Sequence, residues 1–108
     1  MSGRNPQQIL NELPFLYRLT DKAHELLHVE RVVVFGSRAR GDQSQNSDVD
    51  IAFFFPRAFE SMWPEFCAEV DENIPTLLHL DLVNTNKIST DFLHRILKEG
   101  LEIYAKSR

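Results

Sequence analysis

The chain has a single cysteine, Cys67, and this scarcity excludes several kinds of structure. One cysteine cannot form an intrachain disulfide or a zinc site built on cysteine ligands. The fold must therefore rest on its core, and a lone thiol fits the reducing environment of the cytoplasm. With 108 residues the chain is long enough for one such core, so we predict a single domain over residues 1–108. Within it, we expect residues 1–5 to be flexible.

Basic residues and long apolar runs are also scarce. Lysine and arginine number 12 against 16 aspartates and glutamates, which gives a net charge of −4. Broad nucleic-acid binding needs clustered cations, so we expect no direct DNA binding, although one nucleotide triphosphate needs few contacts. No apolar run approaches the ~18 residues of a membrane span, and the N-terminal residues lack the apolar segment of a secretory signal. We therefore predict a cytoplasmic protein without membrane contact.

What the sequence does contain is an alternation of helical and strand patterns. Apolar residues recur at helical or strand spacing in successive segments, bounded by glycine, proline and asparagine. Helices are predicted over residues 14–28 (after a turn at 7–12), 57–72 with a break near Pro64, and 89–99, and strands over 29–35, 48–55, 76–83 and 101–105. This order predicts an α/β (α+β) fold, with a small mixed sheet of about four strands and helices packed on one face.

The most unusual feature is a pair of acids where a strand begins. One apolar strand ends at Gly36-Ser37, a polar loop follows, and the next strand opens with Asp48-Val49-Asp50. Side chains alternate along a strand, so Asp48 and Asp50 share a face and can lean toward one cation. Two carboxylates at the start of a buried strand raise the free energy of the fold unless a cation compensates their charge. Carboxylate oxygens suit Mg²⁺ or Mn²⁺.

A third acid, Asp81, lies on the predicted strand 76–83. It alternates with leucines, so it faces the same side as Asp48 and Asp50 if those leucines face the helices. There it can complete a metal site for phosphoryl transfer or take the proton of an incoming hydroxyl. The alternative is an exposed strand acid without a role in chemistry. We therefore predict that Asp48, Asp50 and Asp81 are the catalytic and metal-binding residues.

The loop between the two strands can supply the phosphate end of such a site. Gly36 lets the backbone approach a ligand closely, and the Ser37 hydroxyl and following N–H groups can bind phosphate oxygens. Arg38 and Arg40 are candidates for the outer phosphates, or else solvated loop charges. The predicted nucleotide-binding residues are thus Gly36, Ser37, Arg38 and Arg40.

These residues carry a family resemblance. Gly36-Ser37, ten residues and then Asp48-Val49-Asp50 match the G-S-x10-D-x-D signature of the DNA polymerase β-like nucleotidyltransferase superfamily. The short length and the segments GSRARGD, DLVN and LKEGLEIY resemble the minimal nucleotidyltransferases (MNT domains) from about residue 14 onward. In that family two motif acids and a third acid bind metal, and Gly-Ser binds nucleotide phosphates. The resemblance implies a nucleotidyltransferase fold with an Mg²⁺ and ATP site on the sheet face opposite the helices.

The resemblance also implies a partner. Larger members of the superfamily carry a further domain that holds the acceptor, and no such segment follows Arg108 here. The chain resembles the MNT antitoxins of HEPN/MNT toxin–antitoxin systems, which transfer AMP from ATP to a tyrosine of a HEPN toxin and silence it. A homo- or hetero-oligomer would fit this role. Two alternatives stay open: a non-catalytic nucleotide-binding subunit that neutralises its partner by contact, and transfer to a small molecule such as an aminoglycoside.

Overall fold

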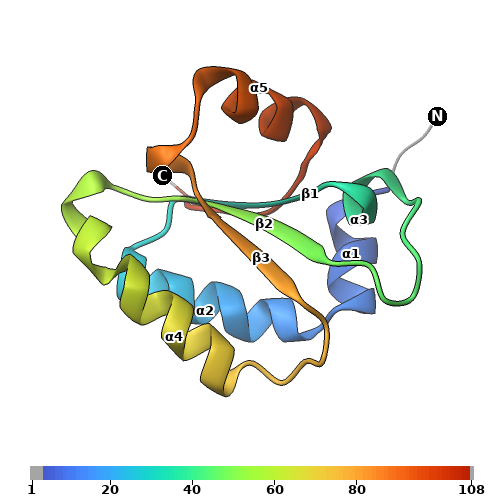
Figure 1. Ribbon diagram of the computed structural model, residues 1–108, viewed down its shortest axis with the longest axis horizontal. Helices are drawn as coiled ribbons and strands as arrows, with labels where there is room; N and C mark the ends of the chain where they lie inside the picture. The colour runs from blue at the N-terminus through green and yellow to red at the C-terminus, as the bar shows by residue number, and fades with distance from the viewer. Residues whose placement is uncertain (1–3, 108) are drawn as a thin grey trace.

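The computed structural model describes residues 4–107 and contains one mixed sheet (Figure 1). Its four strands run in the order β3-β2-β1-β4. The central pair, β1 and β2, is antiparallel, as is β1 with β4, whereas β2 and β3 are parallel. The strands are β1 (Arg31–Phe35), β2 (Val49–Phe54), β3 (Leu80–Asn84) and β4 (Leu101–Ala105). The predicted fold class, a small mixed sheet of four strands with helices, is confirmed.

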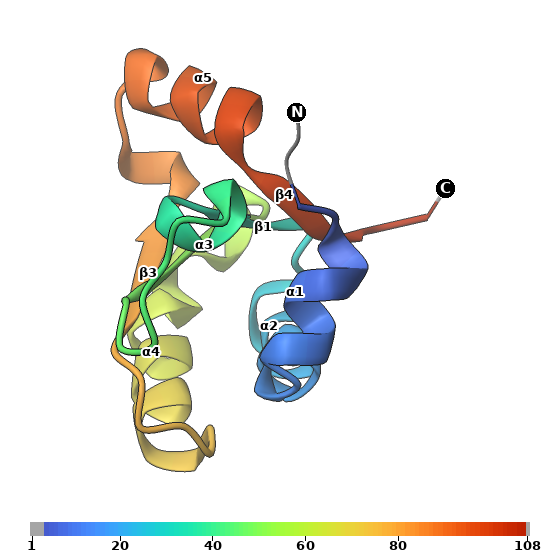
Figure 2. The same ribbon diagram turned by 90° about the vertical axis from the view of Figure 1, so that its right-hand side faces the viewer.

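Three helices cover one face of the sheet and a fourth lies on the other (Figures 1 and 2). The first group comprises α1 (Pro6–Glu12), α2 (Phe15–Leu27) and α4 (Trp63–Asn73), and the helix on the other face is α5 (Thr90–Glu99). Shorter turns are α3 (Ser37–Arg40), η1 (Arg57–Met62) and η2 (Thr85–Lys87). Pro64 sits in the first turn of α4, which is why the predicted 57–72 helix breaks there. Within residues 4–107, no helix is long and apolar enough to cross a bilayer.

The larger core lies between the sheet and the three-helix face. Alternate residues of the central strands, such as Val34 and Phe53, are fully buried against helix side chains such as Leu16. The Phe53 ring meets Phe66 of α4 edge-on, with ring centroids 4.9 Å apart. Each such side chain contributes about 1.5–3 kcal/mol by leaving water. This packing fixes which face of β2 is buried and therefore which face carries its acids.

The prediction that the helices pack on one face is wrong for α5. Val33 and Ala52 point away from the larger core and are buried under Ile96 of α5 instead. The central strands are therefore apolar on both faces over part of their length, and that second apolar surface has to be covered. As a result, α5 lies on the same face as the strand acids and packs on the part of it that includes Val33, Ala52 and Val83.

Two segment boundaries also differ from the predictions. The third strand begins at Leu80 rather than at residue 76, because its parallel partner β2 begins only at Val49, which pairs with Leu80. Residues 76–79 form a turn in which the Thr76 hydroxyl accepts a hydrogen bond from the Leu78 amide. At the N-terminus, Asn5 caps α1 through a reciprocal pair of hydrogen bonds with Gln8, so the expected flexibility does not extend to it. Residues 1–3 lie outside the described range.

Gly100 joins α5 directly to β4 in very little space. A Cβ atom there would lie 2.3 Å from Cγ1 of Val33 and 2.6 Å from the carbonyl oxygen of Ile96. We expect Gly100→Ala to lower the free energy of unfolding by about 2 kcal/mol, because such overpacking forces the helix and strand apart. Urea unfolding monitored by circular dichroism measures this change in the free energy of unfolding. Lys98→Ala, at an exposed position of the same helix, should change stability by less than about 0.5 kcal/mol. Equal effects of the two changes would contradict the packing argument.

Candidate active site

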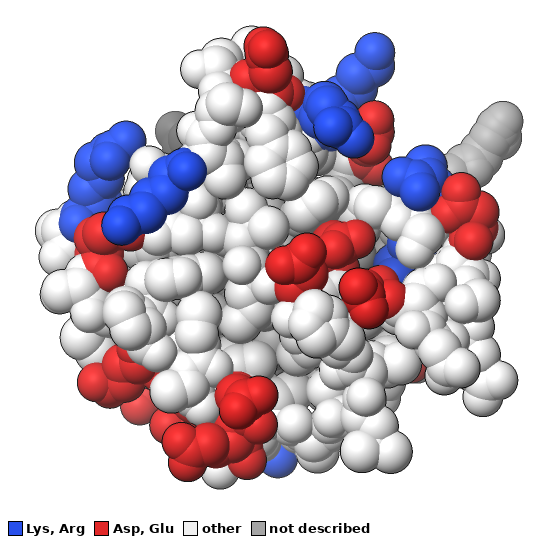
Figure 3. Space-filling model, in the orientation of Figure 1, with Lys and Arg blue, Asp and Glu red and all other residues white. Residues whose placement is uncertain are grey.

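The sheet register brings the three predicted acids together. Asp50 of β2 and Asp81 of β3 are direct partners across the parallel ladder. Asp48 precedes β2 by one residue, so its side chain leaves on the same side as that of Asp50. Figure 3 shows an acidic patch over the middle of the face where β2 and β3 lie in Figure 1. The placement of Asp81 expected from strand alternation is confirmed.

Asp50 is the electrostatic centre of this group. Partial burial raises the pKa of its carboxyl, and the negative charges of Asp81 and Asp48 and a hydrogen bond with Asp81 raise it further. The positive charge of Arg40 acts in the opposite direction. Burial is thus the largest cause of the raised pKa, and the neighbouring carboxylates add to it. Clustered carboxylate oxygens of this kind fit a hard divalent cation.

Asp48 is turned toward a histidine. Nδ1 of His79 lies 3.5 Å from Oδ2 of Asp48, and both side chains are largely exposed. Among residues 4–107, no three histidine, cysteine, aspartate or glutamate side chains converge closely enough to hold an ion as they stand. Asp48 nevertheless lies close enough to Asp50 for its negative charge to raise the pKa of that carboxyl. The sequence gives no sign of this proximity of His79 to Asp48, because it arises where the chain enters β3 beside the start of β2.

Gly36 lies directly against the Asp50 carboxylate. Phe35 is the ladder partner of Asp50, so the chain turns away from the strand at the level of that acid. A Cβ atom on Gly36 would lie 2.3 Å from Oδ2 of Asp50, and the backbone φ of +74° also favours glycine. The sequence suggested that this glycine admits a ligand. In the structure, the absence of a side chain at Gly36 leaves room for the carboxylate of Asp50.

Ser37 begins a closed turn at the end of β1. It is the first residue of α3, a single helical turn. The carbonyl oxygen of Gly36 accepts hydrogen bonds from the amides of Ala39 and Arg40. That of Ser37 accepts hydrogen bonds from the amides of Gly41 and Asp42. The Ser37 hydroxyl is thus carried by a well-bonded turn next to the acids.

The two candidate arginines have different environments. Arg38 is buried, and its guanidinium donates hydrogen bonds to the carbonyl oxygens of Ser47, at 2.9 Å, and Gln45, at 3.4 Å. The Arg38 guanidinium is thus bound to the returning arm of the loop, and phosphate binding by Arg38 stays a prediction. Arg40 is exposed, and its Nε lies 3.2 Å from Oδ2 of Asp42. Its positive charge also lowers the pKa of the Asp50 carboxyl. Phosphate binding by Arg40 stays a prediction.

The raised pKa of Asp50 gives stability a definite pH dependence. Above the ordinary value of 3.8, and up to its folded-state pKa, the folded chain binds more protons than the unfolded chain. The free energy of unfolding therefore falls as pH rises through this window. Without divalent cations we expect Asp50→Asn to be more stable than the wild type at pH 7, with an advantage that shrinks as the pH approaches 3.8.

Urea unfolding in EDTA across this pH range measures the difference. Asp21→Asn, at an exposed position of α2 on the far face, is the matched control and should show no such advantage. A gap between Asp50→Asn and the wild type that widens in acid would contradict the assigned direction.

Comparison with known proteins bears on this arrangement. Residues 18–108 match the family model described as Polymerase beta, Nucleotidyltransferase. The protein MJ1379 of Methanocaldococcus jannaschii, named as a protein adenylyltransferase, is 32% identical over 77 residues. That alignment covers 68% of this chain and 74% of the archaeal protein. The family match includes both motif acids, the Gly-Ser turn and β3.

Solved structures resemble the chain in fold. One is described as a toxin–antitoxin with AMP-PNP, with a TM-score of 0.60 and 18% identity over 84% of this chain and 73% of that chain. Another, from Sulfolobus solfataricus and named as a nucleotidyltransferase, has a TM-score of 0.59 and 20% identity over 97% of this chain and 91% of that chain. At these identities the likeness is one of backbone architecture.

Proposed function

Because the chain belongs to the polymerase β nucleotidyltransferase family and is therefore a nucleotidyltransferase, we propose that it transfers AMP from ATP to a hydroxyl group of a partner protein. The observation that carries this proposal is the ladder pairing of Asp50 with Asp81, beside Asp48 and against Gly36. Three carboxylates next to a glycine-serine turn suit a site that binds a metal ion and a nucleotide triphosphate together.

The acids divide the work of such a reaction. Asp48, Asp50 and Asp81 are the residues that would hold Mg²⁺ or Mn²⁺, and the bound cation supplies positive charge to the triphosphate. Asp81 is also our candidate for the base that accepts the proton of the incoming hydroxyl. The hydroxyl oxygen forms a bond to the α-phosphorus of ATP, the bond from that phosphorus to the bridging oxygen breaks, and pyrophosphate leaves.

The turn after β1 is placed to receive the phosphates. The Ser37 hydroxyl and the backbone of the turn can donate hydrogen bonds to phosphate oxygens, and exposed Arg40 can add a charged contact. Arg38 acts indirectly, because its guanidinium holds the arm of the loop that leads into Asp48. In this proposal the acids bind the metal ion, and the residues of the turn bind the phosphates.

For the partner, we propose a small helical toxin of the HEPN type, with a tyrosine as the acceptor and the chain as its antitoxin. The resemblance to MNT antitoxins supports this assignment. So do the name of the archaeal relative, a protein adenylyltransferase, and the fold shared with a toxin–antitoxin that binds AMP-PNP.

The test is AMP transfer itself. The chain is incubated with Mg²⁺, ATP and the protein encoded by the neighbouring gene, and the intact mass of that protein is measured. We expect a mass increase equal to one or more AMP groups, and no increase with an ATP analogue whose α–β bridge cannot be cleaved. An unchanged partner mass, with both proteins folded and bound to each other, would overturn the proposed activity.

A further inference from the structure

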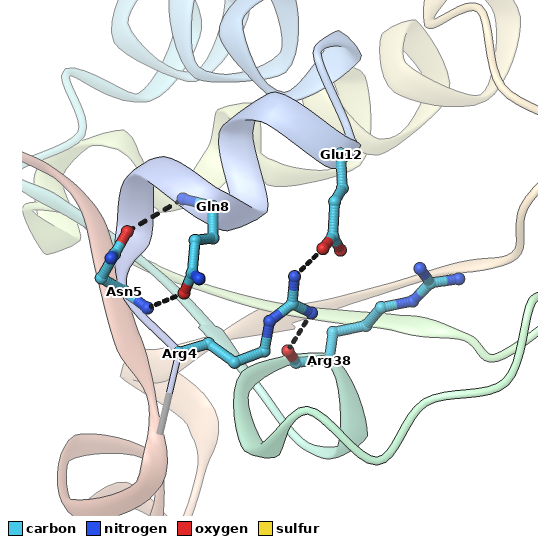
Figure 4. A network of polar contacts seen from close by, with 5 residues as sticks. All are labelled: Arg4, Asn5, Gln8, Glu12 and Arg38. Atoms are coloured by element: carbon cyan, nitrogen blue, oxygen red, sulfur yellow. Dashed lines mark hydrogen bonds and ion pairs between the residues drawn. The ribbon is translucent and has the colours of Figure 1, made fainter. Parts of the chain in front are cut away.

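Arg4 connects the N-terminal helix to the turn that carries Ser37 (Figure 4). Its Nη1 donates a hydrogen bond to the carbonyl oxygen of Arg38 at 3.1 Å, while Nη2 pairs with the carboxylate of Glu12 at the end of α1. The Arg4 side chain is only 13% exposed. A planar guanidinium that binds two acceptors at once has a restricted orientation, so it can connect the two segments.

The aliphatic part of Arg4 packs on the other end of the same turn. Gly41 ends α3 with a φ of +87°, and a Cβ atom on it would lie 3.1 Å from Cδ and 3.2 Å from Cγ of Arg4. Arg4 thus touches the middle of the turn with its charged end and the end of the turn with its stem. Both contacts fall within the segment between β1 and the returning arm of the loop.

Arg38 extends this connection toward the acids. Its carbonyl accepts the hydrogen bond from Arg4, while its guanidinium donates to the carbonyl oxygen of Ser47. Ser47 directly precedes Asp48. The contacts therefore run without interruption from Glu12 through Arg4 and Arg38 to the residue before the first acid.

We propose that Arg4 is a positioning residue that fixes the phosphate-binding turn, residues 36–41, in the geometry that receives a nucleotide. This inference rests on the proposed function for its ligand, although the anchoring itself does not. Among the polar contacts of residues 4–107, Arg4 is bonded to Arg38 and Glu12 and not to Asp48, Asp50 or Asp81. It acts by holding the backbone of Arg38 and Gly41, so its loss should loosen nucleotide binding before it affects the chemical step.

The competing explanation is that Arg4 merely stabilises α1. Asn5 separates the two possibilities, because it caps the same helix through Gln8 and its side-chain bonds stay within α1 (Figure 4). Asn5→Ala should lower stability as an N-cap loss does, but it leaves the bridge to Arg38 in place. It is therefore the matched control for Arg4→Ala.

Two measurements test the proposal on the full chain. Mg²⁺-ATP binding without a partner protein is measured by calorimetry, and amide hydrogen exchange by NMR is measured for residues 39–42, whose amides are hydrogen-bonded within the turn. We expect Arg4→Ala to weaken Mg²⁺-ATP binding about three- to tenfold and to speed exchange at these amides similarly. Asn5→Ala should leave both close to wild type. Arg4→Lys keeps the positive charge and the aliphatic chain but not the planar guanidinium. It should therefore bind Mg²⁺-ATP more tightly than Arg4→Ala and less tightly than the wild type.

The outcomes are distinct. Equal changes in Arg4→Ala and Asn5→Ala, or unchanged exchange at residues 39–42 in Arg4→Ala, would overturn the positioning role. Failure of the wild type to bind Mg²⁺-ATP would overturn the proposed function instead, and the exchange rates would then decide the anchoring role alone.

Discussion

Gly36→Ala is expected to reduce AMP transfer at least about 100-fold, because the added methyl group occupies the position of the Asp50 carboxylate. The methyl carbon would lie 2.3 Å from Oδ2, so either the turn or the acid must move. The backbone φ of +74° adds strain for any residue with a Cβ atom, and we expect the free energy of unfolding to fall by about 2–3 kcal/mol. Transfer rates and urea unfolding measure the two effects.

Gly41→Ala is the matched control for this change. It has a similar positive φ of +87°, but its new methyl group would meet only the flexible stem of Arg4, at 3.1 Å. It should therefore lose stability from backbone strain while retaining much more transfer activity than Gly36→Ala. If Gly36→Ala loses no more activity than Gly41→Ala, then contact with Asp50 is not what this glycine provides.

Asp50→Asn should lower AMP transfer by about 10³-fold or more without loss of folding. The amide has the shape of the carboxylate, so the fit against Gly36 is kept, but the charge that a divalent cation needs is gone. The same variant is expected to be more stable than the wild type in the absence of metal, so reduced activity cannot be ascribed to unfolding. Mass spectrometry of the partner measures AMP transfer, and urea unfolding measures the stability of the variant.

Asp21→Asn is again the control, since it removes an exposed carboxylate from the opposite face. Transfer by Asp50→Asn within tenfold of the wild type would contradict the metal-binding role of this acid. If the variant fails to modify the partner yet still neutralises it, neutralisation works by contact rather than by chemistry.

The arrangement of the acids was predictable because it depends on local rules. The two-residue period of a strand places Asp48 and Asp50 on one face, and the leucines of the third strand place Asp81 on that face as well. The parallel register then sets Asp81 opposite Asp50. The shared face thus follows from local rules, whereas the pairing of Asp50 with Asp81 is a tertiary contact that the fold supplies.

Other features depend on tertiary contacts that the sequence does not display. The stripe of apolar residues on α5 shows that one side of this helix is buried, but not which face of the sheet buries it. Arg38 and Arg40 look equivalent in the sequence, and only the fold turns one of them inward. Arg4 binds a main-chain carbonyl 34 residues away, and a carbonyl group carries no sequence signal.

The place of β3 at the margin of the sheet has a consequence for the acids. Asp50 sits on a strand with hydrogen-bonded neighbours on both sides, whereas Asp81 sits on a strand with a neighbour on one side. Outer strands open locally at a lower free-energy cost than inner ones. Local opening of β3 would therefore withdraw Asp81 while leaving Asp48 and Asp50 in place, which makes Asp81 the acid whose position depends most on the stability of the sheet edge.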